Sequence, residues 1–242
     1  MTEVRKHYDE LLSRHYSWMM GDYETNVHRY TDFFRKHLIV PLLSKRAIDL
    51  GCGTGFQCMA LAEMGFKVVG VDMCAALLDE LKRRGRGHNI SAVQADITRF
   101  RSSVRELPVE VITCMGDTLS HLDSFDTVTR LFDEIHRSLE QGGLVVLSFR
   151  DNHVELKGAD RVIPVRSDSD KLMTTFLEFR GNHLVVNDII YTKGSTGWSV
   201  EKGSYKKLRI GAEWAARQLE RRGFRIMWEG VEDGFAVIIA ER

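Results

Sequence analysis

Proline and cysteine are scarce in this sequence: only three of its 242 residues are proline and four are cysteine. The cysteines include no Cys-x-x-Cys pair, which argues against a zinc site or a disulfide framework. Neither charge sign dominates, because 34 lysines and arginines balance 34 aspartates and glutamates. A protein built mainly to bind a nucleic-acid backbone would be basic, so we expect no nucleic-acid partner.

Long apolar runs are absent as well, and none approaches the roughly 20 residues needed to span a bilayer. The start of the sequence, Met-Thr-Glu-Val-Arg-Lys-His, is too charged to lead into the apolar core of a signal peptide. Hydrophobic residues make up 43% and charged residues 28% of the chain, which is typical of globular proteins. We therefore expect a cytoplasmic, membrane-free protein with a single domain over residues 1–242, of undetermined oligomeric state.

What is present from residue 46 onward is an alternation of short apolar runs and helical patterns. The expected strands are 47–50, 67–71, 90–95, 109–115 and 144–149. The expected helices are 56–64, 75–84 and 126–139. Such alternation predicts βαβ units and a largely parallel sheet with helices on both faces.

The flanking regions follow other patterns. Helical periodicity covers residues 3–14 and 22–40, and a further helix with two strands is expected at 211–222, 224–229 and 235–240. Between them, strand patterns at 160–166, 171–180, 183–192 and 204–209 include a turn signal at Gly181-Asn182, which predicts an antiparallel hairpin. The chain thus divides into a helical lid (1–43), a core (44–151), an antiparallel insertion (152–210) and a C-terminal part that completes the sheet (211–242).

The strongest local signal is Asp49-Leu50-Gly51-Cys52-Gly53-Thr54-Gly55, where a strand runs into a glycine-rich turn that opens a helix. Glycines allow the backbone to approach a ligand closely, and the helix start offers free N–H groups. Asp72 ends the next strand, where its carboxylate can accept both hydroxyls of a ribose. In open α/β sheets ligands bind at the carboxyl ends of the strands, so the pattern predicts a nucleoside-type cofactor there.

Two cofactor classes fit a glycine loop followed by an acid about twenty residues on. The dinucleotide fingerprint is G-x-G-x-x-G, but here residue 56 is Phe and the third glycine comes one residue early. The spacing favours a cofactor without phosphates. An NAD-dependent oxidoreductase remains the alternative enzyme, and a catalytically silent cofactor-binding protein is the non-enzymatic alternative.

With these motifs, residues 45–151 resemble the class I S-adenosylmethionine-dependent methyltransferases. Asp49–Gly55 looks like their first motif, which holds the methionine end of the cofactor. Asp72 and Met73 look like the second, on the ribose and adenine, and Asp96-Ile97 looks like the third, at the adenine amino group. The resemblance implies a seven-stranded sheet with an antiparallel last strand, S-adenosyl-L-methionine as cofactor, and the cofactor-binding residues Asp49, Gly51, Cys52, Gly53, Gly55, Asp72, Met73, Asp96, Ile97 and Met115.

A closer resemblance is to glycine N-methyltransferase and related small-molecule methyltransferases. It rests on Met115–Leu122 after the fourth strand and on the segment 16–22. It implies that Tyr16 closes over the cofactor, that His121 contacts cofactor or substrate, and that Arg150 grips the substrate. Asp117 stands where that family places an amide that helps hold the substrate.

The resemblance implies in-line attack of a nitrogen or oxygen of a small molecule on the sulfonium methyl. Asp117 or His121 is the candidate general base, and the opposite charges of Asp117 and Arg150 suit a zwitterionic or amine-bearing acceptor. Met-Gly-Asp-Thr at 115–118 differs from the Pro-Pro-Tyr or Pro-Pro-Phe segment of base-methylating enzymes. No metal is expected, because the N-terminal histidines lack a compact ligand spacing.

Several of these residues also have a structural interpretation. Asp49 can cap a helix, Asp96 can be a turn residue, His121 can be a packing residue, and Arg150 can form an ordinary ion pair.

Overall fold

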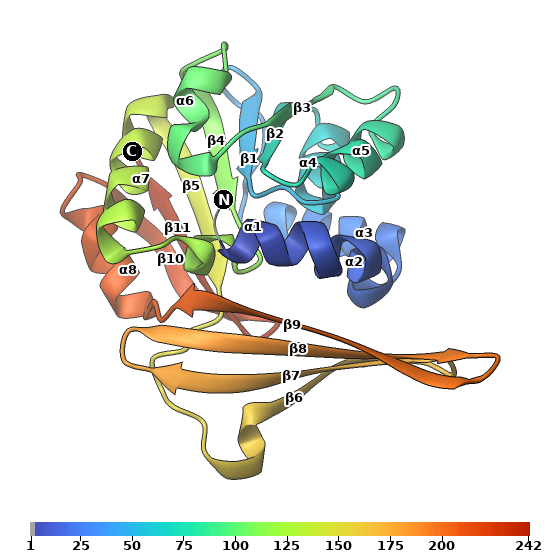
Figure 1. Cartoon of the computed structure of the whole chain (residues 1–242). Coiled ribbons are helices and arrows are strands. Elements are labelled where there is room, and N and C mark those ends of the chain that lie inside the picture. The colour runs from blue at the N-terminus through green and yellow to red at the C-terminus, as the bar shows by residue number, and fades with distance from the viewer. Residues whose placement is uncertain (1–2) are drawn as a thin grey trace.

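A seven-stranded sheet forms the centre of the molecule in a computed structural model that describes residues 3–242 (Figure 1). Its strand order is β10-β11-β5-β4-β1-β2-β3. Five neighbouring strands, β5, β4, β1, β2 and β3, pair in parallel. Strand β11 runs antiparallel to both of its neighbours, β5 and β10. The strands are β1 (Arg46–Leu50), β2 (Lys67–Asp72), β3 (Ile90–Gln94), β4 (Val109–Cys114), β5 (Leu139–Phe149), β10 (Arg225–Glu232) and β11 (Phe235–Glu241). The predicted sheet, with its antiparallel last strand, is confirmed.

Helices cover both faces of this sheet. One face is packed by α3 (Tyr23–Lys36), α4 (Phe56–Glu63) and α5 (Ala75–Arg84). The other is packed by α6 (Phe100–Ser103), α7 (Phe125–Ser138) and α8 (Ala212–Glu220). Every residue of the central strand β4 is buried, as expected for a parallel strand that is covered on both sides. None of the helices in residues 3–242 combines the length and the apolar character needed to cross a membrane.

The segment after β5 forms a separate four-stranded antiparallel sheet, as predicted. Its strands are β6 (Val162–Ser167), β7 (Lys171–Arg180), β8 (His183–Gly194) and β9 (Gly197–Leu208), in that order. Arg180 pairs with His183 across the predicted two-residue turn. The last strand begins at Gly197 and not at Ser204 as the sequence predicts, because residues 197–203 also pair with β8. The sequence does not reveal this half of the strand, since it is mostly exposed.

The first N-terminal helix extends further than predicted, to Met20. α1 (Glu3–His7) continues through a π-helical turn (Tyr8–Leu12) into α2 (Ser13–Met20), where the sequence predicts an end at residue 14. Its apolar side chains pack on β7, β8 and β9, so the helix lies between the seven-stranded core and the insertion sheet (Figure 1). Residues 1–2 of the predicted lid segment lie outside the described residues.

Two further boundaries differ from the predictions. The second helix, expected to reach residue 40, ends at Lys36, because Leu38 adopts a left-handed backbone conformation. Strand β5 begins at Leu139 rather than at residue 144, since Leu139 already pairs with Val109 ahead of the glycine pair at 142–143.

Candidate active site

Except for Tyr16, which lies on the N-terminal helix, the predicted site residues lie at or near one edge of the large sheet. The glycine loop follows β1, Asp72 ends β2, Asp96 comes shortly after β3, and Met115 follows β4. These strands are parallel neighbours, so their carboxyl ends meet at the same edge. This edge is where open α/β sheets bind their ligands.

The glycine loop is held tightly against strand β2. The N–H of Gly51 donates to the carbonyl of Val71 at 2.8 Å, and Gly51 has a φ of 75°. A Cβ at this position would lie 2.4 Å from the Thr118 hydroxyl oxygen. Both the left-handed conformation and the close approach require glycine here.

Asp72 ties the end of β2 to the glycine loop. One carboxylate oxygen accepts a hydrogen bond from the Gly53 N–H at 2.9 Å, and the other accepts from the Cys74 N–H at 2.8 Å. Burial raises the pKa of Asp72, opposed by these backbone hydrogen bonds. Each oxygen keeps a lone pair for a further donor. Met73 is half-buried beside it, and its carbonyl accepts from Gln94.

Asp96 and Ile97 lie at the start of a short helical turn after β3. The Oδ1 atom of Asp96 accepts from the Thr98 N–H at 2.8 Å and from the Thr98 hydroxyl at 2.7 Å. Asp96 therefore does act as a local cap, while its other oxygen accepts no hydrogen bond from residues 3–242. Ile97 is buried beneath it.

Asp49 lies beneath the loop, almost fully buried at 1% exposure. It accepts hydrogen bonds from the Thr113 hydroxyl at 2.7 Å and from the Cys58 thiol at 3.4 Å. Burial raises the pKa of Asp49 to about 6, with both hydrogen bonds opposing the shift. It does not form the side-chain helix cap considered from the sequence, since no side chain caps the start of α4.

Replacing Asp49 with asparagine should change the pH dependence of stability. The wild-type protein binds this proton more tightly when folded, so its stability falls as the pH rises from about 4 to about 6. Above that window the loss amounts to about 3 kcal/mol, since one pKa unit corresponds to about 1.4 kcal/mol. Urea unfolding should show Asp49→Asn gaining stability relative to wild type between pH 4 and pH 8; an unchanged difference at the two pH values would contradict this.

Four rings, the aromatic row, extend from the glycine loop towards β9: they are Tyr16 and Tyr8 of the N-terminal helix, His121 after β4, and Tyr205 of β9. A Cβ on Gly53 would lie 3.2 Å from the Tyr16 hydroxyl oxygen, which places Tyr16 directly over the loop. Successive ring centroids along the row are 6.4, 5.9 and 5.7 Å apart. Burial raises the pKa of all three phenols, that of Tyr205 to about 12. The row therefore carries no phenolate charge near neutral pH.

His121 is the member of the row that follows β4. Its Nε2 atom is buried and has no hydrogen-bond partner among residues 3–242. Burial, and then the charge of Lys207, lower the pKa of His121 to about 3. The imidazole is therefore neutral near pH 7, with one ring nitrogen left for a bound molecule.

Asp117, Arg150 and Lys207 form a charge cluster at the ends of β4, β5 and β9. Asp117 Oδ2 accepts from Arg150 Nη1 at 2.8 Å and from Lys207 Nζ at 2.9 Å, and Oδ1 accepts from the Arg150 backbone N–H at 2.7 Å. Although burial favours the neutral acid, the charges of Lys207 and Arg150 hold the pKa of Asp117 well below its usual range. A carboxylate held in this way is a weak proton acceptor.

Sequence reasoning brought Asp117 and Arg150 together but missed Lys207. The available signal was the alternation of Tyr205 and Lys207 within the predicted strand 204–209, which puts both side chains on one face. That face proves to be the one turned towards the strand ends, where Lys207 is 9% exposed.

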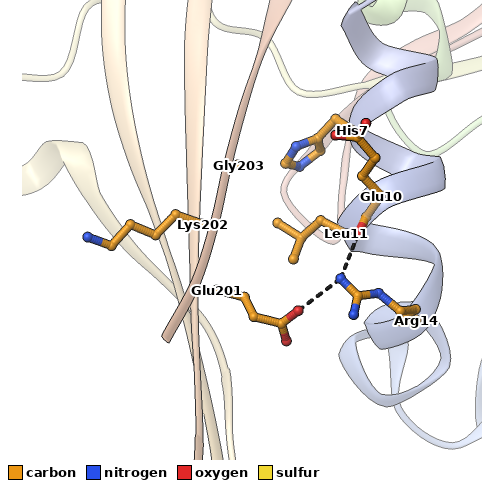
Figure 2. Close-up of a pocket in the computed structure, with 7 residues that line it drawn as sticks. All are labelled: His7, Glu10, Leu11, Arg14, Glu201, Lys202 and Gly203. Atoms are coloured by element: carbon orange, nitrogen blue, oxygen red, sulfur yellow. Dashed lines mark hydrogen bonds and ion pairs between the residues drawn. The ribbon is translucent and has the colours of Figure 1, made fainter. Parts of the chain in front are cut away.

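A cavity of about 360 Å³ opens at the same edge, between α3 and the β10–β11 hairpin. The residues that line it include Met115, Gly116, Ser148, Tyr30 and Phe235. A second hollow, of about 340 Å³, lies away from the strand ends, between the N-terminal helix and β9 (Figure 2). There Arg14 bridges Glu201 and the Glu10 carbonyl across the gap. Among residues 3–242, no cluster of three His, Cys, Asp or Glu side chains could hold a metal ion.

The strand order, with antiparallel β11 between β5 and β10, and the glycine loop after β1 define the class: this is a class I methyltransferase fold. The family model described as a methyltransferase domain matches residues 47–143. The match is confined to these residues, and the fold is that of the class I S-adenosylmethionine-dependent methyltransferases.

Individual relatives agree with this assignment. A cypemycin N-terminal methyltransferase from Streptomyces sp is 33% identical over 111 residues, covering 46% of this chain and 44% of the relative. A glycine/sarcosine N-methyltransferase from Halorhodospira halochloris is 28% identical over 132 residues, covering 54% and 48%. Among solved structures, a SAM-bound amino pentose methyltransferase from Micromonospora echinaspora superposes with a TM-score of 0.69 at 18% identity, covering 92% of each chain. The matched part thus spans about half the length of these two curated relatives.

Proposed function

We propose that this protein transfers the methyl group of S-adenosyl-L-methionine to a nitrogen or oxygen of a small molecule. The observation that carries the proposal is the convergence of the glycine loop, Asp72, Asp96 and Met115 on one edge of the sheet. The all-parallel order of a dinucleotide-binding sheet is 3-2-1-4-5-6, and the antiparallel β11 beside β5 departs from it. The fold thus counts against the oxidoreductase alternative.

The residues at this edge fit that cofactor. The left-handed glycines of the loop carry no Cβ and so let a ligand approach the backbone closely. Asp72 keeps lone pairs for the ribose hydroxyls, Asp96 keeps one oxygen for the adenine amino group, and Ile97 and Met73 offer apolar contact. Gly51, Cys52, Gly53 and Gly55, with Asp49 beneath them and Tyr16 and Met115 beside them, would hold the methionine part. When bound, the cofactor supplies an activated methyl group on a sulfonium.

The chain's own residues would then position the acceptor. Holding a nucleophile near the reacting atom and in line can contribute roughly 7–11 kcal/mol. Of the two candidate bases, His121 is better placed, because its Nε2 has no partner among residues 3–242, whereas both oxygens of Asp117 accept hydrogen bonds. With its lowered pKa, His121 would orient the acceptor N–H or O–H chiefly by a hydrogen bond. Arg150 would contact the acceptor beyond Asp117.

Calorimetry and a product assay test the proposal together. S-adenosylmethionine and S-adenosylhomocysteine should bind, and NAD should not. Release of S-adenosylhomocysteine should then require an amine or hydroxyl acceptor. Binding of NAD alone would overturn the assignment, and cofactor binding without turnover on a broad acceptor panel would favour the catalytically silent alternative.

Replacing His121 with phenylalanine should separate its function from packing. Phenylalanine keeps the ring and removes a buried nitrogen that has no partner, so the free energy of unfolding should stay equal or rise by about 1–3 kcal/mol. Turnover should fall at least tenfold. Denaturant unfolding and the product assay check this, and a marked loss of stability would show that the imidazole is a structural residue.

Replacing Arg150 with alanine should leave cofactor affinity nearly intact and lower kcat/KM for the acceptor. Its side chain is 58% exposed, and Lys207 still pairs with Asp117 in the variant, so the fold should change little. Arg150→Lys should recover little activity if the contact with the acceptor is bidentate. Equal losses of cofactor affinity and turnover would contradict a substrate role.

A further inference from the structure

The charge cluster carries one more positive than negative charge. Asp117 is the single carboxylate between two cations, Arg150 and Lys207, at 2.8 and 2.9 Å. The next carboxylate on the insertion sheet, Asp188, is already held by His7 Nε2 at 2.9 Å and by the Thr175 hydroxyl at 2.6 Å. Among residues 3–242, Asp188 forms no ion pair with Lys207 or Arg150.

Lys207 brings this surplus into the interior. Its side chain is 10% exposed, compared with 58% for Arg150. It lies beside the ring of Tyr205, with Nζ 5.8 Å from the ring centroid, and Tyr205 is the neighbour of His121 in the aromatic row. An ammonium group has three N–H donors. Asp117 takes one of them, and the Tyr205 hydroxyl is a second partner of Lys207, which leaves one donor for a bound molecule.

We infer that Lys207 is the residue that selects the acceptor, by binding a carboxylate group on it. This rests on the proposed function, since it assumes that the acceptor lies at the same strand ends. A buried cation with a free donor gains most from an anionic partner, because an unpaired charge in an enclosed site is costly. An acceptor with a carboxylate would complete a cluster of two cations and two anions, with its nucleophile towards the unpartnered nitrogen of His121.

Because Lys207 lies on β9, the proposed contact with the carboxylate is made by the insertion sheet. Lys206, the preceding residue of β9, points the other way, is 56% exposed and pairs with Glu3 at 3.2 Å. The two lysines thus form a matched pair within one strand: one faces the strand ends and the other faces solvent.

The test uses the full chain saturated with S-adenosylhomocysteine and pairs of probes that differ only in the carboxylate. Suitable pairs are glycine and glycinamide, benzoate and benzamide, and 2-aminobenzoate and 2-aminobenzamide. By calorimetry, the wild type should bind the carboxylate of at least one pair at least tenfold more tightly than the amide. Lys207→Met should abolish this preference and Lys206→Met should keep it.

A second variant, Asp117→Asn, tests the inference even if Lys207→Met fails to fold. It removes the only negative charge of the cluster, so carboxylate affinity should rise severalfold, whereas a merely structural ion pair predicts no gain. An absent preference in all pairs, a preference kept in Lys207→Met, or an affinity lowered in Asp117→Asn would overturn the inference. Failure of S-adenosylhomocysteine itself to bind the wild type would instead overturn the proposed function.

Discussion

Replacing Asp117 with alanine should lower the free energy of unfolding by about 3–5 kcal/mol, the cost typical of breaking a buried ion pair on one side. The variant would leave Lys207 buried and without its carboxylate. Lys207 has its pKa raised by Asp117 against the opposing effect of burial, so the lysine would have to stay charged and unpaired or lose its proton. Urea unfolding at pH 7 measures the loss.

Arg150→Ala is the matched control for this prediction. It removes the exposed partner of the same carboxylate and should cost less than about 1 kcal/mol. Because the pKa of Asp117 is lowered in the folded protein, its ionised form stabilises the fold at pH values above about 4, and this stabilisation is lost as the pH falls further. Because the pKa of Lys207 is raised, its protonated form stabilises the fold at pH values below about 10. The gap between the two variants should therefore persist from pH 5 to pH 9. Equal losses in both variants would contradict a buried Asp117–Lys207 pair.

Replacing Asp72 with alanine should weaken binding of S-adenosylmethionine at least tenfold. Each hydrogen bond to an ionised acceptor contributes roughly 1.5–3 kcal/mol, and the proposed ribose contact has two. The same change removes the acceptor of the Gly53 and Cys74 N–H groups, which loosens the loop. Calorimetry of the variant gives the affinity, and the melting temperature of the ligand-free protein should fall by only a few degrees.

Asp79→Ala provides the control for Asp72. Asp79 is an exposed acid on the neighbouring helix α5 and pairs with Lys82 at 3.0 Å. Its removal changes the net charge equally but touches no strand end. Unchanged cofactor affinity in Asp72→Ala, or an equal loss in Asp79→Ala, would exclude Asp72 as the ribose ligand.

The parts of the fold that local signals determine were predictable from the sequence. Helix α5 and strand β7 have the predicted bounds, because periodicity and flanking turn residues specify them. The glycine loop and Asp72 could also be placed, since strand ends of a parallel sheet meet by topology. Even the local cap formed by Asp96 follows from its residue type.

The parts that depend on distant contacts could not be predicted. Lys207 and Asp117 are separated by 90 residues in the sequence, and the residues around each of them do not indicate that the two form an ion pair. The first half of β9 is built by pairing with β8, as between Val200 and Tyr191, and not by an apolar pattern of its own. The unpartnered nitrogen of His121 is likewise visible only once its surroundings are known.

The π-helical turn at Tyr8–Leu12 sets the angular phase of the N-terminal helix. In a regular α-helix each residue turns by about 100°, so residues eight positions apart point in directions that differ by about 80°. The wider turn absorbs that difference, and Tyr8 and Tyr16 face the same side with ring centroids 6.4 Å apart. Meanwhile Val4 and Leu11 face the insertion sheet. Deleting one residue from this turn would restore the regular period and rotate Tyr8 away from Tyr16, so the direction in which Tyr8 points depends on a single extra residue.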